Sequence, residues 1–136
     1  MRSMKIKEIM SDSPVTVGMN DTINTMRQIL SHARFHHLLV VENDKLVGVV
    51  SDRDMLRALS PNLDTPAETV EDIATLDTRA HEIMSTNLIT LPGDATIGDA
   101  IDIFNRYPIS CIPIVAGSQA VGIVSWRDIL RAMPTG

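Results

Sequence analysis

The sequence predicts an α+β protein in which two copies of a βαββα unit pack together as a pseudo-twofold pair. Residues 5–58 align with residues 79–132 without a gap, at an offset of 74 positions and with 18 identities in 54 positions. Within each copy, short apolar runs bounded by turn residues alternate with apolar residues at helical spacing. Because a repeat of this size usually buries its apolar face only against a neighbour, we expect the copies to stack.

Two motifs carry the duplication. Glu-Ile-Met-Ser at 8–11 returns at 82–85, and Gly-Val-Val-Ser-Asp-Arg-Asp at 48–54 returns as Gly-Ile-Val-Ser-Trp-Arg-Asp at 122–128. Both motifs fall at the same places in the two copies. The same order of elements is therefore expected in each copy: helix, strand, helix, strand, strand, helix.

The first copy sets this pattern. Residues 7–10 indicate a short helical turn, and residues 15–17 a strand. Asn20 or Asp21 is expected to cap a helix whose apolar residues share one face, namely Ile23, Met26, Ile29 and Leu30. The elements expected next are a strand from Phe35 or His37 to Val41, a polar turn at 42–45, a strand at 46–50 and a helix at 51–59.

The second copy repeats the plan, with strands at 88–91, 109–115 and 120–124 and helices at 95–105 and 125–132. We therefore divide the chain into a first repeat at 1–59, a linker at 60–78 and a second repeat at 79–136. The linker contains Pro61 and Pro66. Its apolar residues recur at every third position and predict a short helix, so part of the linker should be ordered: Val70, Ile73 and Leu76.

Composition narrows the function classes. Twelve basic residues against 17 acidic ones give a net charge of −5, which argues against a duplex nucleic acid partner. The single cysteine, Cys111, excludes an internal disulfide. Neither an apolar run approaching about 20 residues nor a signal peptide is present, so we expect a soluble cytoplasmic protein without a membrane partner.

The repeated Ser-x-x-Asp turn is the strongest candidate for chemistry. At 51–54 a predicted strand meets a predicted helix, so backbone N–H groups converge where an anion is favoured. Arg53 adds a planar fork of donors suited to phosphate. Asp54 is the residue type that accepts hydrogen bonds from the two hydroxyls of a ribose.

A simpler interpretation of the same motif is a helix capping box, in which Ser51 and Asp54 satisfy each other's backbone N–H groups. Duplication would copy such a cap without any ligand. The glycines that precede the motif, Gly48 and Gly122, suggest the close approach of another group. The capping and ligand-binding roles are compatible.

These motifs, in this order, resemble the cystathionine-beta-synthase (CBS) domain, and two in tandem resemble the CBS pair called a Bateman module. The resemblance implies a stand-alone regulatory module that binds AMP, ADP, ATP or S-adenosylmethionine in clefts between the repeats and forms a homodimer. It places the ribose-binding aspartate at Asp54 and Asp128 and a ligand-facing hydroxyl at Ser51 and Ser125. Arg53 and Arg127 fall at the position close to phosphate.

Further ligand contacts are expected beside these turns. The adenine edge would meet the first strands of the repeats, at Thr16 and Val17 and at Thr90 and Leu91, although apolar residues at strand spacing also indicate core. Because side chains alternate along a strand, His36 and His37 point to opposite faces, and one of them at most faces a cleft. We assign His37 to the ligand; the alternative is that it is an exposed histidine at the end of the strand. Trp126, which replaces Asp52, belongs near the second turn or at a dimer face.

Catalytic and metal sites are not predicted. His32, His36 and His37 lack a matching set of carboxylates, and Cys111 has no neighbouring base. The sequence therefore predicts a non-enzymatic sensor that has no obligatory cofactor, binds an adenosine nucleotide or S-adenosylmethionine, and signals through its dimer to an effector protein that the sequence does not identify. The alternatives are an unliganded structural or protein-interaction module and, less favoured, an enzyme that uses the cleft.

Overall fold

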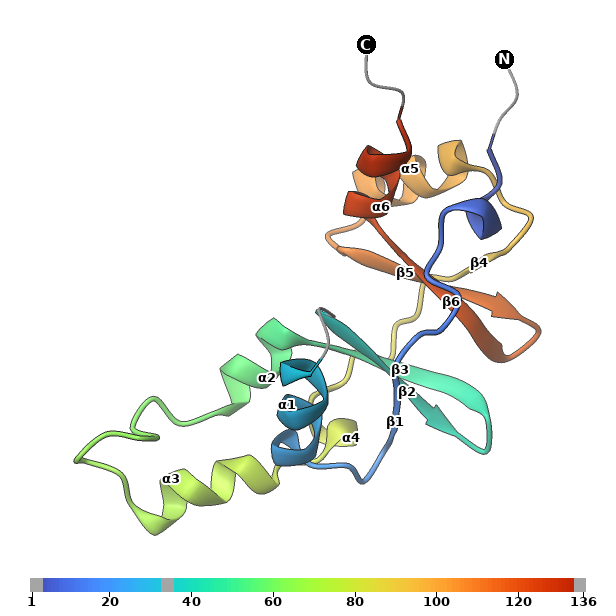
Figure 1. Cartoon of the computed structure of the whole chain (residues 1–136). Helices are drawn as coiled ribbons and strands as arrows, with labels where there is room; N and C mark the ends of the chain where they lie inside the picture. The colour runs from blue at the N-terminus through green and yellow to red at the C-terminus, as the bar shows by residue number, and fades with distance from the viewer. Residues whose placement is uncertain (1–3, 33–35, 134–136) are drawn as a thin grey trace. The chain divides into compact units, whose positions relative to one another are not determined.

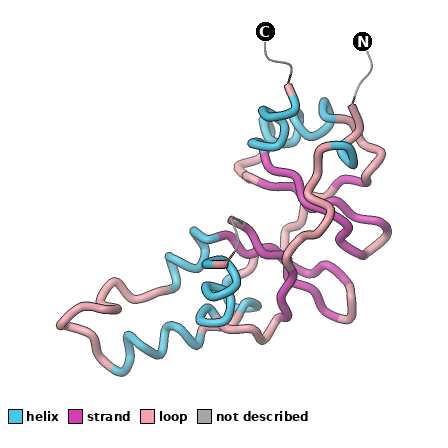
Figure 2. Tube along the Cα trace, viewed as in Figure 1, coloured by secondary structure: helices cyan, strands magenta, loops and turns pink. Residues whose placement is uncertain are grey.

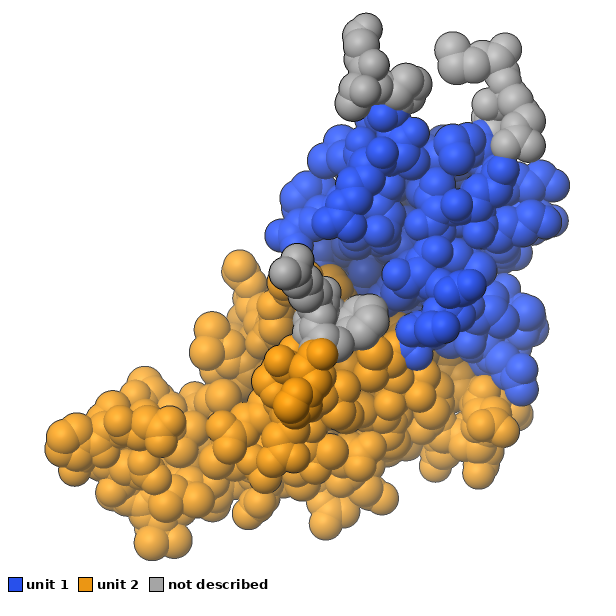
Figure 3. Space-filling model, viewed as in Figure 1, with its two compact units in different colours: residues 1–14, 89–136 blue, residues 15–88 orange. Residues whose placement is uncertain are grey.

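The computed structural model describes residues 4–32 and 36–133. The chain forms two compact units, of which one is continuous in sequence and the other combines both ends of the chain (Figure 3). Unit 1 comprises residues 1–14 and 89–136, and unit 2 comprises residues 15–88. The predicted repeats have different bounds, because they are separated by the linker at 60–78. The division into repeat, linker and repeat therefore stays a prediction and does not coincide with the boundaries of the compact units.

Each unit contains one three-stranded mixed sheet and confirms the predicted α+β class (Figures 1 and 2). In unit 2 the order is β1-β2-β3, with β1 parallel to β2 and β2 antiparallel to β3. The elements of this βαββα unit are β1 (Thr16–Gly18), α1 (Ile23–Ser31), β2 (His37–Glu42), β3 (Lys45–Ser51) and α2 (Asp52–Ala58). Helices α1 and α2 lie on the same side of the sheet (Figure 1).

Unit 1 has the same topology, with strand order β4-β5-β6. Its elements are β4 (Leu91–Pro92), α5 (Ile97–Arg106), β5 (Cys111–Ala116), β6 (Gln119–Ser125) and α6 (Trp126–Ala132). The predicted elements are thus present in both copies, with ends that differ by a few residues. One predicted start of the strand β2, Phe35, lies outside the described residues.

Apolar side chains between the sheet and its helices form a separate core in each unit. The fully buried residues of unit 2 include Ile23, Met26, Leu38, Val40 and Val50. Those of unit 1 include Ile6, Ala100, Ile112, Ile114 and Val124. The helical face predicted for α1 is confirmed, since Ile29 and Leu30 pack partly buried beside Ile23 and Met26.

The beginning of each repeat packs on the other repeat. We call residues 4–14 and 79–88 the leading segments. The first contains the 3₁₀ turn η1 (Ile6–Glu8) and lies in unit 1, where Ser11 and Ile123 exchange two backbone hydrogen bonds of 3.0 Å. The second contains α4 (Ala80–Ile83) and lies in unit 2, where Ser85 and Val49 exchange bonds of 2.9 and 3.1 Å. The duplicated Glu-Ile-Met-Ser motif is therefore an exchanged packing element.

The repeated glycines make room for this exchange. A Cβ atom on Gly48 would lie 2.5 Å from Met84 Sδ and 3.0 Å from Met84 Cβ. A Cβ atom on Gly122 would meet Met10 in the same way and would also lie 2.9 Å from the backbone oxygen of Ser11. The group predicted to approach these glycines closely is therefore the methionine of the exchanged leading segment.

The predicted cap of the first long helix is wrong. Thr22, rather than Asn20 or Asp21, is the N-cap of α1, and its side chain accepts a hydrogen bond from Thr25 N at 3.2 Å. The Asp21 carboxylate instead accepts a bond from Gly18 N at 2.6 Å, which holds the turn after β1. In the second copy Thr96 caps α5 in a capping box with Asp99.

Both hairpins contain a two-residue turn and a β-bulge. Asn43 and Asp44 have φ values of 51° and 63°, the left-handed combination of a type I′ turn. Between Val40 and Val41 the register shifts, since Val41 pairs with Leu46 whereas Val40 pairs with Gly48. The same shift occurs in unit 1 between Ile114 and Val115. As a result, His37 lies opposite Ser51 and Cys111 lies opposite Ser125.

The segment at 60–78 is partly helical, as its spacing predicts. It contains α3 (Val70–Ala74) and the 3₁₀ turn η2 (Thr75–Asp77), whereas residues 60–69 extend away from the sheet of unit 2 (Figure 1). Ser60 donates to Asp72 at 2.6 Å, and this bond, followed by the bond from the Thr69 N–H, lowers the pKa of the Asp72 carboxyl. Val70 is nonetheless 81% exposed, so its apolar side chain is not part of the core.

Replacing the glycines tests the exchanged packing. Gly122→Ala should destabilise the protein by about 1–3 kcal/mol, because the added Cβ atom meets the backbone oxygen of Ser11, which cannot move aside as a flexible side chain can. Gly48→Ala should cost less, since the two closest atoms, Sδ and Cγ of Met84, belong to a flexible side chain that can rotate. Gly98→Ala in α5, whose Cβ atom would lie 3.6 Å from Thr96 Oγ1, is the control and should be neutral or stabilising. Urea denaturation measures the three free energies of unfolding; equal values would contradict the exchange as a source of strain.

Candidate functional site

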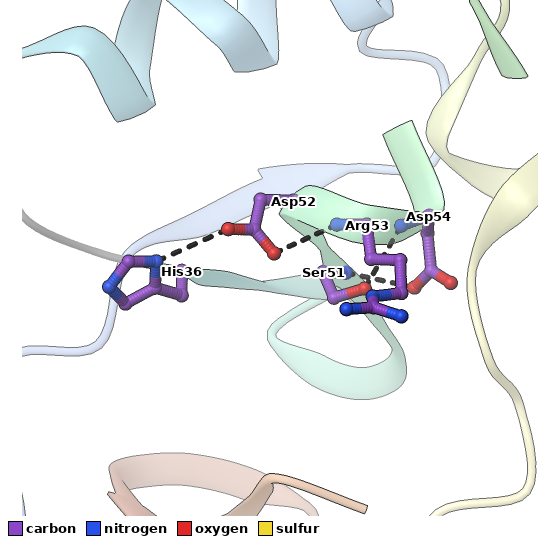
Figure 4. Close-up of polar contacts among 5 residues, drawn as sticks. All are labelled: His36, Ser51, Asp52, Arg53 and Asp54. Atoms are coloured by element: carbon purple, nitrogen blue, oxygen red, sulfur yellow. Dashed lines mark hydrogen bonds and ion pairs between the residues drawn. The ribbon is translucent and has the colours of Figure 1, made fainter. Parts of the chain in front are cut away.

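The Ser51–Asp54 turn in unit 2 is a complete capping box (Figure 4). Ser51 ends β3 and is the N-cap of α2. Its Oγ accepts a bond from Asp54 N at 3.0 Å, and Asp54 Oδ2 accepts one from Ser51 N at 2.9 Å. Both side chains are half-buried, whereas Arg53 is exposed. The bonds of the box fix the Asp54 carboxylate through Oδ2, which leaves Oδ1 outside the box.

A second acidic group, for which the sequence predicted no role, belongs to the same turn. Asp52 Oδ2 lies 3.2 Å from His36 Nδ1, and Asp52 Oδ1 accepts a bond from Arg53 N at 2.8 Å. The backbone also joins these residues, because Asp52 N donates to His36 O at 2.9 Å. Figure 4 shows the Asp52 carboxylate directed toward His36 and the Asp54 carboxylate on the other side of the turn.

The corresponding turn in unit 1 has the same cap and different neighbours. Ser125 N donates to Asp128 Oδ2 at 2.8 Å, and Asp128 N donates to Ser125 Oγ at 3.3 Å. In place of the Asp52–His36 pair, the Arg127 guanidinium lies 5.2 Å from the centre of the Trp126 ring, within range of a cation–π contact. Trp126 is therefore near the second turn, one of the two places expected for it.

The other predicted ligand residues differ in what they expose. Thr16 is exposed, whereas Val17 is 4% exposed and belongs to the core, so only its backbone remains for a ligand. Thr90 and Leu91 are half-buried. His37 is half-buried opposite Ser51. Each of these assignments stays a prediction.

Two features of the turns were not predicted from the sequence. One is the His36–Asp52 pair, and the other is the Trp126–Arg127 contact. The adjacent positions of Trp126 and Arg127 gave a signal for the second feature. No sequence signal indicated the His36–Asp52 pair, because a hairpin without the bulge would place His36 opposite Ser51 rather than next to Asp52.

The chemistry of the remaining candidates is limited. Burial raises the pKa of the Cys111 thiol to about 12, and the side chain is 7% exposed, which opposes its use as a nucleophile. Across residues 4–32 and 36–133, there is no group of three or more His, Cys, Asp or Glu side chains placed to hold a metal ion. In the same part of the chain, no helix is long and apolar enough to cross a membrane.

Comparison with known proteins gives the family. The model of the CBS domain matches the chain twice, at residues 6–61 and 80–135. The chain belongs to the CBS domain family. It carries two CBS domains in tandem, and each match contains one complete Ser-x-x-Asp turn. The family resemblance of the sequence is thereby confirmed.

Curated relatives of this CBS pair are longer proteins. An L-aspartate semialdehyde sulfurtransferase of Methanocaldococcus jannaschii is 33% identical over 128 residues, which cover 93% of this chain and 22% of the relative. The uncharacterised protein MJ1404 of the same organism is 30% identical over 135 residues, covering 96% of this chain and 32% of the relative. The chain thus spans a third or less of the length of these relatives.

Solved structures of other CBS pairs share the fold over nearly the whole chain. The CBS domain pair of protein MJ0100, solved in complex with 5′-methylthioadenosine and S-adenosyl-L-methionine, is 29% identical, with a TM-score of 0.79 and coverage of 96% of this chain and 95% of that one. The CBS domain of a CBS domain-containing membrane protein from Sphaerobacter thermophilus is 28% identical, with a TM-score of 0.83 and coverage of 98% and 90%.

The protonation of Cys111 can be tested directly. With a pKa of about 12, about one thiol in ten thousand is ionised at pH 8, so alkylation by iodoacetamide should be far slower in the folded protein than in urea. Mass spectrometry of the modified chain gives both rates. Alkylation of the folded protein as fast as of the unfolded chain would contradict the burial of this thiol.

Proposed function

We propose that the chain is a regulatory module that binds an adenosyl ligand, such as AMP, ADP, ATP or S-adenosylmethionine, and signals through the conformation of a homodimer. The observation that carries this proposal is the likeness to the CBS pair of MJ0100, whose structure contains two adenosyl compounds. The identity of 29% extends over almost the full length of both chains. A module of this kind responds only if the ligand binds one dimer conformation more tightly than the other.

The geometry of the two turns supports a ribose-phosphate ligand. The capping bonds hold each aspartate carboxylate in a fixed orientation without using all of its acceptor sites, since Asp54 and Asp128 accept through Oδ2. Oδ1 is then the acceptor for the ribose hydroxyls. Arg53 and Arg127, both exposed, supply donors for phosphate from the next position.

The remaining contacts follow the same plan. In each unit the first strand would present the adenine with backbone groups, from Thr16 and Val17 in one and from Thr90 and Leu91 in the other. His37 would face the ligand beside Ser51. The expected clefts between the repeats belong to this proposal, as does a cytoplasmic location.

A specific observation favours the alternative, a structural or protein-interaction module without a ligand. The capping boxes at Ser51 and Ser125 are complete, so the repeated motif has a structural role in both copies. On α6 the apolar side chains of Trp126 and Leu130, four residues apart, share one helix face, and Met133 follows at the C-cap; they are 44%, 57% and 45% exposed. Both proposals use this stripe as a surface for a second copy of the chain.

Ligand binding separates the two proposals. Titration calorimetry with AMP, ATP and S-adenosylmethionine should detect binding, and Asp54→Ala and Asp128→Ala should each raise the dissociation constant at their own turn at least tenfold, because a hydrogen bond to a charged group contributes about 1.5–3 kcal/mol. Asp72→Ala and Asp99→Ala remove equivalent capping boxes elsewhere in units 2 and 1. Asp99→Ala should lose about 1 kcal/mol of stability, Asp72→Ala should lose more because it also removes the bond from Ser60, and both controls should keep full affinity.

The controls decide how a negative result is interpreted. An equal loss of affinity in all four variants would mean that the turns act only through stability. Absence of binding by any of the three ligands at millimolar concentration would favour the unliganded module.

The dimer is tested separately at the stripe on α6. Leu130→Glu should shift the protein toward monomer in light scattering, since it places a charge in an apolar interface. Asp102→Ala on α5, which removes an exposed ion pair with Arg106, is the control and should leave the mass unchanged. A Leu130→Glu protein that remains dimeric would exclude this surface.

A further inference from the structure

The two turns differ by one charged side chain at one position. Overlay of the repeats places Asp52 where the second copy has Trp126, while the serine, arginine and aspartate around them are identical. With histidine neutral, residues 51–54 carry a formal charge of −1 and residues 125–128 a formal charge of 0. The two turns are therefore alike in geometry and unlike in charge.

The Asp52 carboxylate is held within the first turn. It is fixed from two sides, by His36 Nδ1 at 3.2 Å and by the Arg53 N–H at 2.8 Å. Its exposed fraction is 57%, so water screens the charge only in part. A phosphate that binds at the Arg53 backbone N–H would meet the Asp52 charge, because the Asp52 carboxylate already accepts the hydrogen bond of that N–H.

The second turn offers the opposite arrangement. Trp126 contributes no charge, and its ring lies 5.2 Å from the Arg127 guanidinium. Such a contact restrains the guanidinium while leaving its N–H groups as donors. Arg127 is thus a positive group beside the turn that is preceded by Trp126 rather than by a carboxylate.

We infer that residue 52 or 126 sets the charge preference of each turn, so that the turn in unit 2 selects a neutral or cationic adenosyl compound and the turn in unit 1 selects a phosphorylated one. This inference rests on the proposed function and adds to it a ligand class for each repeat. S-adenosylmethionine carries a positive sulfonium at the position where AMP carries a dianionic phosphate. 5′-Methylthioadenosine has the same adenosine and no charge there.

These three compounds form the probe set. Asp128→Ala leaves the turn in unit 2 as the intact site, and Asp54→Ala leaves the turn in unit 1. In the Asp128→Ala background, Asp52→Asn removes the charge and keeps the shape of the side chain. AMP should then bind about three- to tenfold more tightly and S-adenosylmethionine more weakly by a similar factor, as one charge at several ångströms in partly screened surroundings would give. The affinity for 5′-methylthioadenosine should not change.

The reciprocal exchange tests the second turn. In the Asp54→Ala background, Trp126→Asp should weaken AMP binding and strengthen S-adenosylmethionine binding. Asp44→Asn is the matched control: it removes the same charge from unit 2 at the opposite end of β3, and its positive φ is one that asparagine tolerates. This control should leave all three affinities unchanged.

The outcomes distinguish the inference from the proposal beneath it. If the compounds bind and the ratio of AMP to S-adenosylmethionine affinity is the same in Asp52→Asn, in Trp126→Asp and in their parent backgrounds, the charge preference is wrong and the adenosyl module stands. If none of the three compounds binds even to the unmodified protein, both fail together.

Discussion

The pairing of each leading segment with the last strand of the other repeat is the contact on which the rest of the structure depends. Ser11 and Ile123, like Ser85 and Val49, exchange both backbone hydrogen bonds, and in each pair the strand residue lies two residues before the strand ends. The methionine next to each serine fills the space over a glycine. This packing fixes the strand whose final residue is the capping serine, and so it positions the turn proposed to bind a ligand.

The fold was largely predictable from the sequence because duplication supplies every signal twice. The prediction of a weak helix such as α1 is supported by the prediction of its counterpart α5, and the interpretation of Gly48 is supported by the glycine at the same position of the second copy, Gly122. The exchange itself was not predictable. Met10 and Met84 occupy the same position in their repeats and are chemically identical, so the pattern contains nothing that distinguishes packing within a repeat from packing across repeats. The cap at Thr22 was missed because Asn20 and Asp21 are equally good cap residues in isolation.

The candidate site shows where sequence reasoning ends. The Ser-x-x-Asp spacing predicted the capping box in both copies, because three residues bring the two side chains to facing backbone groups. The surroundings of the box depend on register. One additional residue in β3 shifts the pairing between Val40 and Val41, and this shift decides that His37 faces Ser51 across the sheet. A bulge in an apolar strand has no clear sequence signal, so the His36–Asp52 pair could not be predicted from the sequence.

The glycine-methionine contact has a consequence for how the gene can change. A larger residue at position 48 must be accommodated at position 84, which lies in the other half of the duplicated gene, and position 122 is tied to position 10 in the same way. Neither half can drift independently, and neither can be lost while the other persists unaltered. The difference between Asp52 and Trp126 thus arose in two halves of the gene that must be inherited together. The segment between the two halves is where the length of the chain can vary.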